Sequence, residues 1–299
     1  MSILVLGTVA LDTVRTPYGE RKKILGGSAS HFAMSARLFS RVNIVSVVGS
    51  DFPQRHLDFL RGKNISLASL SRSPEKTFAW EGEYRGDLDT ARTLRTELGA
   101  LVTFKPQVFA RERGASHVFL ANIDPDLQQA VLRQLRRPAL IAMDSMDYWI
   151  RHKRASLLRL MKRVDIFMAN DQEARSLTGE DSLVAAARGL RALGPKLILV
   201  KKGQHGSLMY GGSFFIVLPA YPVAAVIDPT GAGDTFAGGF MGYLAQAGSC
   251  GGGALKKALV WGTVAASFNV EGFGLERTAT LTKKALQARA TAFRRQVSF

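Results

Sequence analysis

An aspartate at the end of a glycine-rich turn is the feature of this sequence best suited to chemistry. The segment Asp228-Pro-Thr-Gly-Ala-Gly-Asp234 follows an apolar stretch and precedes an apolar, helix-like run. Pro229 cannot continue a central strand, and Gly231 and Gly233 permit a tight turn of the backbone. The N–H groups of Gly231, Ala232 and Gly233 would then point out of a helix N-terminus, which is a binding site for anions such as phosphate.

Asp234 places a carboxylate beside this anion site, where it would repel phosphate. One interpretation is that Asp234 takes a proton from an attacking hydroxyl, as a general base does in phosphoryl transfer. The other is that Asp234 caps the helix, since aspartate is a good cap and interacts favourably with the helix dipole. The turn by itself favours neither role.

The elements that must position this turn alternate between strands and helices. Apolar runs that alternate with segments of helical spacing indicate parallel strands joined by helical crossovers. Strands buried on both faces need continuous apolar runs. We therefore predict one α/β domain over residues 1–299 with a mainly parallel central sheet. The predicted strands are Ile3–Val9, Asn43–Val48, His117–Ala121, Leu140–Asp144, Ile166–Asn170 and Leu197–Lys201, and the predicted helices are Ser28–Phe39, Phe52–Leu60, Leu127–Leu135, Ala155–Val164, Leu183–Leu193, Thr235–Ala247, Ala254–Asn269 and Thr282–Arg295.

Two segments, at about 13–25 and 75–98, break this alternation. The first carries charged and turn residues. In the second, Thr77–Tyr84 and Thr90–Leu98 alternate polar and apolar residues around Gly86-Asp87, which is typical of strands with one face in solvent. Together the segments predict a small β-sheet that stands off the main one, either as a lid over a cleft or as an edge hairpin.

The composition limits the classes of partner and compartment. The net charge of +16 is typical of nucleic-acid-binding proteins, but the basic residues are spread along the chain and no basic run alternates with aromatic residues. We therefore expect no nucleic-acid partner and no membrane span. The single cysteine, Cys250, cannot form an internal disulfide, and the N-terminus lacks the basic start of a signal peptide, so we expect a cytoplasmic protein.

The thirteen residues Asp228–Phe240 closely resemble the C-terminal signature of the PfkB/ribokinase family of sugar and nucleoside kinases. The segment is not a P-loop, because the pattern Gly-x-x-x-x-Gly-Lys-Ser/Thr is absent from the chain. The resemblance extends over nearly the whole chain. It implies a ribokinase-like three-layer α/β/α fold, transfer of the ATP γ-phosphoryl group, Asp234 as general base, and an anion hole at Gly231, Ala232 and Gly233.

A second set of motifs resembles the part of the family that binds the acceptor. The resemblance assigns Asp12, after the first predicted strand, and the pair Gly26-Gly27 to the acceptor. Asp12 would end a strand, where α/β folds place ligand-binding groups, although it could also be a turn-forming aspartate. The family usually has asparagine at the position of His31, which we also assign to the acceptor.

The acceptor itself is not fixed by these motifs. Phe78 and Trp80 of the predicted lid would cover it or pack their own sheet, and Asn122 and Asp144 are weaker candidates because they end predicted strands. We favour a free sugar such as ribose, with a nucleoside of the adenosine or inosine/guanosine type as the alternative. A non-catalytic ligand sensor and a nucleic-acid-binding protein are less favoured. A homodimer formed through the lid is a further expectation.

Asn170 and Glu173 follow a predicted strand and share one helical face. Their oxygens suit Mg²⁺, which usually keeps several of its waters, but an Asn N-cap with Glu three residues later is also a capping-box pattern. The resemblance implies that these residues organise Mg²⁺ and phosphate through water. It also places a nucleotide-binding loop at Lys201, Gly203 and Gly206.

The resemblance implies two further sites near the end of the chain. We expect the adenine to lie against the helix that contains Ala265, Ala266 and Asn269. Family members often use a monovalent cation, and a K⁺ site would begin at Asp228 and Thr230, with Thr230 also near the nucleotide.

Overall fold

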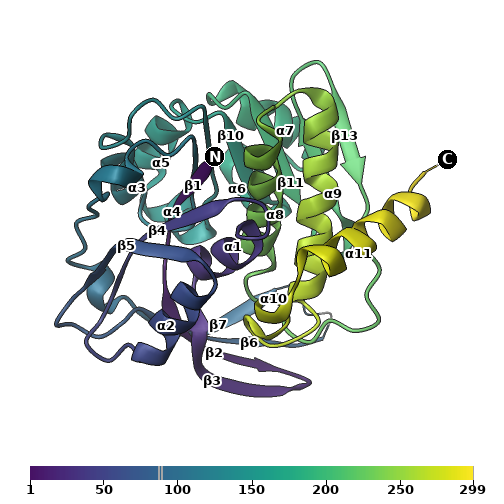
Figure 1. Cartoon of the computed structure of the whole chain (residues 1–299). Helices are drawn as coiled ribbons and strands as arrows, with labels where there is room; N and C mark the ends of the chain where they lie inside the picture. Colours follow the sequence, from purple (N-terminus) through teal and green to yellow (C-terminus); the bar gives the residue numbers. More distant parts are fainter. Residues whose placement is uncertain (87, 89, 299) are drawn as a thin grey trace.

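The computed structural model describes residues 1–86, 88 and 90–298, and its centre is a nine-stranded sheet (Figure 1). The strand order is β13-β12-β11-β10-β9-β8-β1-β4-β5. Neighbouring strands are parallel from β11 to β5, whereas β12 and β13 form an antiparallel hairpin at one edge. The predicted mainly parallel sheet is confirmed. The strands are β1 (Ser2–Leu6), β4 (Arg41–Val48), β5 (Ile65–Arg72), β8 (His117–Leu120), β9 (Leu140–Met143), β10 (Ile166–Asn170), β11 (Leu197–Lys201), β12 (Ser207–Tyr210) and β13 (Phe215–Leu218).

Helices cover both faces of this sheet, because its buried strands alternate their side chains between two apolar cores. Ile3 and Val5 of β1 face one core, and Leu4 and Leu6 face the other. The first core is closed by α1 (Ser28–Ala36), α2 (Gln54–Gly62), α8 (Ala232–Ala247), α9 (Gly252–Asn269) and α11 (Lys283–Gln296). The second is closed by α3 (Pro125–Leu132), α4 (Asp147–His152), α5 (Arg154–Met161), α6 (Asp171–Thr178) and α7 (Leu183–Ala192). The three-layer α/β/α architecture is thereby confirmed.

A second, four-stranded sheet stands at one end of the molecule (Figure 1). Its order is β3-β2-β6-β7, with β2 (Ala10–Thr16), β3 (Gly19–Gly26), β6 (Ala79–Tyr84) and β7 (Ala91–Glu97). β2 and β6 are parallel, and the outer pairs are antiparallel. The sheet begins three residues before the predicted lid segment, at Ala10, and Asp87 of the predicted turn lies outside the described residues.

Two predicted boundaries near the site are wrong. The first strand ends at Leu6, and Asp12 lies within β2 of the small sheet instead of at the end of a central strand. The helix predicted from Thr235 begins at Ala232, so the glycine-rich turn runs into its first turn. In both cases glycine is involved: Gly7 follows the first strand, and Gly231 and Gly233 allow a backbone that apolar periodicity does not reveal. No helix within the described ranges combines the length and apolar character that crossing a membrane requires.

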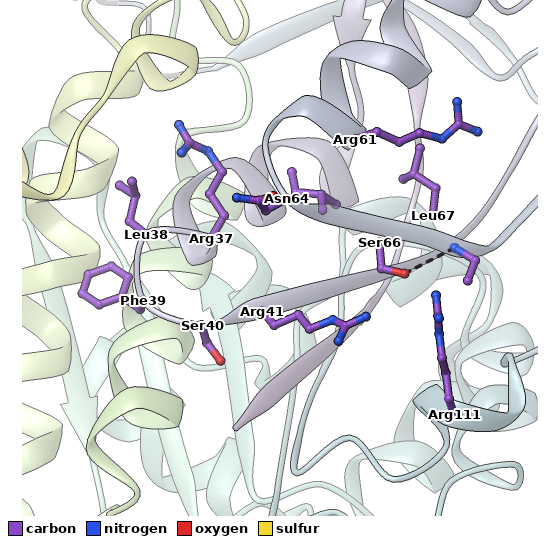
Figure 2. Close-up of a pocket in the computed structure, with 12 residues that line it drawn as sticks. Arg37, Leu38, Phe39, Ser40, Arg41, Arg61, Asn64, Ser66, Leu67 and Arg111 are labelled. Atoms are coloured by element: carbon purple, nitrogen blue, oxygen red, sulfur yellow. Dashed lines mark hydrogen bonds between the residues drawn. The ribbon is translucent and has the colours of Figure 1, made fainter.

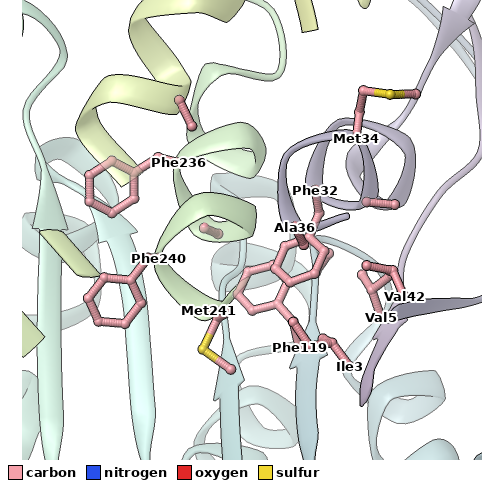
Figure 3. Close-up of a cluster of buried hydrophobic side chains, with 14 of the residues drawn as sticks. Ile3, Val5, Phe32, Met34, Ala36, Val42, Phe119, Phe236, Phe240 and Met241 are labelled. Atoms are coloured by element: carbon pink, nitrogen blue, oxygen red, sulfur yellow. The ribbon is translucent and has the colours of Figure 1, made fainter. Parts of the chain in front are cut away.

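Glycines let α1 and α9 pack closely on the two sides of α8. A Cβ added at Gly238 would lie 2.2 Å from the carbonyl oxygen of Phe32 in α1. One added at Gly239 would lie 2.8 Å from the carbonyl oxygen of Trp261 in α9. Beside this contact the rings of Phe32 and Phe119 stack at 4.5 Å between centroids, and Phe236, Phe240 and Met241 project from α8 (Figure 3). This packing fixes α8, whose N-terminus carries the glycine-rich turn.

The α1–α8 contact gives a test of the fold. We expect Gly238→Ala to lower the free energy of unfolding by about 1–3 kcal/mol, because the added methyl group meets backbone and cannot be accommodated by a rotamer change. The matched control is Gly253→Ala, at an exposed position of α9 where an added Cβ has no neighbour within 4 Å. The control should be neutral or slightly stabilising. Urea denaturation measures both, and equal stability of the two variants would contradict the packing.

Candidate active site

Polar residues from four neighbouring strands meet at the carboxyl edge of the central sheet. Asn170 and Lys201 end β10 and β11 and are register partners. Asp144 directly follows β9, and Asn122 follows β8 by two residues. Open α/β sheets bind ligands at this edge, where the chain leaves adjacent strands in opposite directions. The strand ends therefore bring together residues that lie far apart in the sequence.

The glycine-rich turn closes over this edge. Gly231 is the N-cap of α8 and has φ 71°, a left-handed conformation that favours glycine. The predicted set of three anion-binding N–H groups needs one correction, because the N–H of Ala232 donates to the carbonyl oxygen of Pro229. Within the described chain the N–H groups of Gly231 and Gly233 have no protein acceptor. Two donors at a helix N-terminus thus remain for an anion.

Asp234 is the third residue of α8 and does not cap the helix, since Gly231 occupies the cap position. Burial, reinforced by the nearby carboxylate of Asp144, raises the pKa of Asp234 to about 8, and the ammonium group of Lys201 opposes this rise. Asp12 and Glu173 add smaller repulsive contributions. A carboxylate with a pKa near neutrality and a position beside an anion site is suited to accept a proton from a hydroxyl.

Lys201 lies among these acids. Its Nζ is 3.5 Å from Oδ2 of Asp144, and only 18% of its side chain is exposed. Burial raises the pKa of Glu173 to about 7, against the opposing charge of Lys201. These contacts show that Lys201, predicted only as part of a nucleotide loop, belongs to the same cluster as Asp234. Asp144, a weaker candidate from the sequence, lies at its centre.

The acceptor motif surrounds Asp12, which is buried. Its Oδ2 accepts a hydrogen bond of 3.2 Å from the N–H of Gly27, whose φ of 91° is left-handed. A Cβ added at Gly26 would lie 1.9 Å from the same Oδ2, so a side chain there would displace the carboxylate. Burial raises the pKa of Asp12 to about 7, and the Gly27 hydrogen bond opposes this. Asp12, Gly26 and Gly27 therefore form one unit in which the glycines make room for the aspartate.

Asn269 joins His31 of α1 to the glycine-rich turn. Its side chain is buried, donates to the carbonyl oxygen of Thr230 at 2.8 Å, and accepts from the Thr235 hydroxyl at 2.9 Å. Its Oδ1 also lies 3.0 Å from Nδ1 of His31, which must then donate. The ring of His31 lies against Gly231, where an added Cβ would be 2.3 Å from it. Asn269 was predicted near the adenine; these three contacts tie its amide to the turn and to His31, and the adenine contact stays a prediction.

The small sheet turns an aromatic side chain toward the acceptor unit. Trp80 is the register partner of Asp12, so both side chains lie on the same face of the sheet. Its indole lies over Gly82, where an added Cβ would be 2.0 Å from the ring, and its Nε1 donates to Thr93 at 3.2 Å. Phe78 immediately precedes this strand and is partly buried. The hydroxyl of Tyr84 contacts that of Thr230 at 3.3 Å, which links the sheet to the glycine-rich turn.

The capping-box interpretation of Asn170 and Glu173 is confirmed. Oδ1 of Asn170 accepts from the Glu173 N–H at 2.7 Å, and Oε2 of Glu173 accepts from the Asn170 N–H at 2.8 Å. Oε1 of Glu173 takes no part in the box, and the carboxylate of Asp144 and the ammonium group of Lys201 lie near enough to shift the pKa of Glu173. Such a donor set fits a hydrated Mg²⁺, which prefers oxygen ligands and keeps its waters.

Asp228 holds the start of the turn. It is fully buried, and its two oxygens accept from the N–H groups of Thr230 at 2.8 Å and Gly274 at 2.9 Å. The carboxylate is thus satisfied by backbone donors from two loops. A K⁺ ion at Asp228 and Thr230 stays a prediction.

The remaining predicted residues do not all lie near the cluster of Asp234, Asp144 and Lys201. Gly203 and Gly206 close a short turn after β11, in which the Lys202 N–H donates to the Gly206 carbonyl. Ala265 is buried against α8, so it is not at a surface where an adenine could lie, whereas Ala266 is partly exposed. The side chain of Asn122 contacts Trp149 and Met146. Of these residues, the turn at Gly203–Gly206 is adjacent to Lys201 and hence to the cluster.

Comparison with known proteins agrees with this arrangement. The profile of the pfkB family carbohydrate kinases matches residues 2–281. The chain belongs to this family. It is 33% identical over 250 residues to a cytidine kinase from Thermococcus kodakarensis, covering 81% of this chain and 88% of that protein. It is 28% identical over 278 residues to a nucleoside kinase from Methanothermobacter thermautotrophicus, covering 89% and 84%.

A solved structure shares the fold over almost the full length. The nucleoside kinase of Methanocaldococcus jannaschii, an archaeal member of the ribokinase family, superimposes with a TM-score of 0.79 at 23% identity and covers 97% of this chain and 98% of its own. The predicted resemblance and fold are thus confirmed, and the protein is a kinase.

A broad pocket of this kinase lies away from the residues described above. It borders β5 and the end of α1, and it is lined by Arg37, Arg41, Arg61 and Arg111 among others (Figure 2). None of the candidate catalytic residues contributes to it. The candidate catalytic residues therefore lie at the sheet edge and not in this pocket.

The raised pKa of Asp234 predicts the pH dependence of the kinase. A general base acts when deprotonated, so kcat/KM should fall about tenfold per pH unit as the pH drops below about 8. Initial rates between pH 6 and 9, with circular dichroism to verify folding, measure this. A kcat/KM that does not change between pH 6 and 9 would show that no group of the free enzyme with a raised pKa limits the reaction.

The Asn269 contacts predict a second effect. Asn269→Ala removes the partner of the Thr230 carbonyl, the Thr235 hydroxyl and Nδ1 of His31, and each such group that stays buried and unpaired costs about 1–3 kcal/mol. We expect a clear loss of stability in urea together with a reduced kcat, because the Thr230 carbonyl and His31 both support the turn. Gln246→Ala, at an exposed position of α8, is the control and should change the free energy of unfolding by less than about 0.5 kcal/mol. Equal behaviour of the two variants would contradict the role of Asn269.

Proposed function

We propose that this kinase transfers the γ-phosphoryl group of ATP to the primary hydroxyl of a nucleoside. The observation that carries the proposal is the convergence of Asp234, with its raised pKa, and the free N–H groups of Gly231 and Gly233 at one helix N-terminus. A base and an anion site at the same position suit a hydroxyl nucleophile and a phosphoryl electrophile.

The chain's own residues account for the transfer. Asp12 and His31 orient the acceptor, with its hydroxyl directed at Asp234. As the hydroxyl oxygen forms its bond to the γ-phosphorus of ATP, Asp234 takes the hydroxyl proton. The bond between the γ-phosphorus and the β,γ-bridging oxygen breaks, and ADP leaves with that oxygen. The N–H groups of Gly231 and Gly233 stabilise the charge on the transferring group, since they are already oriented before reaction.

Mg²⁺ and the nucleotide would lie on the other side of the turn. Glu173 would hold Mg²⁺ through water, and when bound the ion would neutralise the charge on the phosphate oxygens. Asn170, Thr230 and the turn at Gly203–Gly206 would border the phosphates. Ala266 would lie nearer the adenine than the buried Ala265. A K⁺ ion beside Asp228 would add positive charge, as Mg²⁺ does.

Two observations favour a nucleoside over a free sugar. The flat position of Trp80 over Gly82 offers a face on which a nucleobase can stack, next to the carboxylate of Asp12 that would accept sugar hydroxyls. The cytidine kinase and nucleoside kinase relatives point the same way. A free sugar such as ribose is the second candidate, favoured by the carbohydrate-kinase family and by Asp12 itself.

A substrate panel tests the acceptor. ATP consumption is measured with cytidine, adenosine, inosine, guanosine, ribose, fructose and ketohexose phosphates. We expect a nucleoside to give the highest kcat/KM, and Trp80→Ala to lower kcat/KM for that nucleoside at least tenfold more than for ribose. A ribose rate above every nucleoside rate would favour the second candidate.

Asp234→Asn tests the base. We expect turnover to fall by ~10²–10⁴-fold, because the amide cannot accept the hydroxyl proton, while ATP binding by calorimetry stays close to wild type. Glu180→Gln, an exposed substitution after α6, is the control. A variant that keeps more than about a tenth of the wild-type rate would show that Asp234 is not the base.

A further inference from the structure

The ammonium group of Lys201 lies at the anion site itself. Lys201 ends β11, and its Nζ is 2.9 Å from the position that a Cβ on Gly233 would take. The free N–H of Gly233 belongs to the same residue. A phosphoryl oxygen bound by that N–H would therefore lie within reach of the ammonium group. Glycine at position 233 is what leaves room for this side chain.

The contact between the ammonium group of Lys201 and the carboxylate of Asp144 is long. The distance of 3.5 Å to Asp144 exceeds the ~2.7–2.9 Å of a charge-assisted hydrogen bond, and an ammonium group has three donors to satisfy. Oδ1 of Asp144 is buried and has no hydrogen-bond partner in the described structure. A buried charge pair is stable when its remaining hydrogen-bonding groups are also satisfied. The ammonium group of Lys201 thus has donors left for an anionic group, whereas Oδ1 of Asp144 is left as an acceptor.

The charges around Asp234 require a cation during transfer. Asp12, Asp144 and Glu173 are the other acids that shift its pKa, and among the described residues Lys201 is the one cation that does so. A phosphoryl group that arrives at Gly231 and Gly233 adds further negative charge. An ammonium group between the phosphoryl group and the carboxylates reduces this repulsion, and the effect grows as charge develops in the transition state.

On these grounds, and resting on the proposed function, we propose that Lys201 is a catalytic residue that stabilises the transferring phosphoryl group, and that Asp144 is the residue that positions it. Lys201 donates hydrogen bonds and keeps its protons throughout. The bonds that form and break, and the proton taken by Asp234, are those given above. Burial opposes the charge of Lys201, but the carboxylates of Asp144, Glu173 and Asp234 raise its pKa, so it stays protonated.

Lys201→Met tests the proposal, because methionine fills similar space without charge. We expect kcat to fall by ~10²–10³-fold with the best acceptor of the panel, as for removal of one oxyanion donor, while the Kd for ATP measured without acceptor changes less than tenfold. Lys196→Met is the matched control, since Lys196 precedes the same strand and is 81% exposed in a pair with Asp165. A kcat within threefold of wild type, or a loss confined to ATP binding, overturns the proposal.

A pH profile separates this role from a structural one. Removing the positive charge of Lys201 should move the acid limb of kcat/KM to higher pH, and Asp144→Asn should move it to lower pH, because the two groups act on Asp234 with opposite sign. If Lys201 and Asp144 have only a structural role, both variants should lose stability, and the acid limbs of their pH profiles should not move in opposite directions. If Asp234→Asn is inactive and Lys201→Met is active, only the Lys201 proposal fails; if Asp234→Asn is active, the proposed mechanism fails.

Discussion

The burial of several carboxylates close to one edge of the central sheet is the constraint on which this site depends. Asp144 and Glu173 follow central strands, Asp12 comes from the small sheet and Asp234 from α8. Burial raises the pKa of Asp12, Glu173 and Asp234 to about 7 or 8. The fold offsets part of this cost with the positive end of α8, the N–H of Gly27 and the ammonium group of Lys201. The part of this cost that is not offset favours the binding of protons and of cationic groups at the site. A site for phosphoryl transfer needs both.

Rigid packing lets the molecule hold these charges in place. The close approach of α1 and α9 to α8 fixes the direction of the helix whose N-terminus carries the turn. Asn269 and Asp228 then tie the turn to the loop after α9 and to His31 through buried hydrogen bonds. Because these contacts are made within the protein, the N–H groups of Gly231 and Gly233, which we propose bind the phosphoryl group, are already oriented before transfer.

The small sheet is part of the site as well as its cover. Asp12 and Trp80 are partners across β2 and β6, and Tyr84 of the same sheet reaches Thr230 of the turn. A movement of this sheet would therefore shift Asp12, which we propose binds the acceptor, together with Trp80 and the turn. This coupling gives a physical reason for acceptor binding and the assembly of the anion site to be linked.

The sequence by itself determined the fold class, the glycine-rich turn and the ends of β4, β10 and β11, because apolar periodicity, glycine and proline act locally. The general-base assignment of Asp234 also came from local sequence and a family signature, and it is still to be tested. Tertiary structure alone decided that Asn269 hydrogen-bonds to Thr230 and His31, and that Lys201 lies against Gly233. These contacts join residues that lie far apart in the sequence. Apolar periodicity along the chain predicts that a residue is buried, but it does not predict which group that residue contacts.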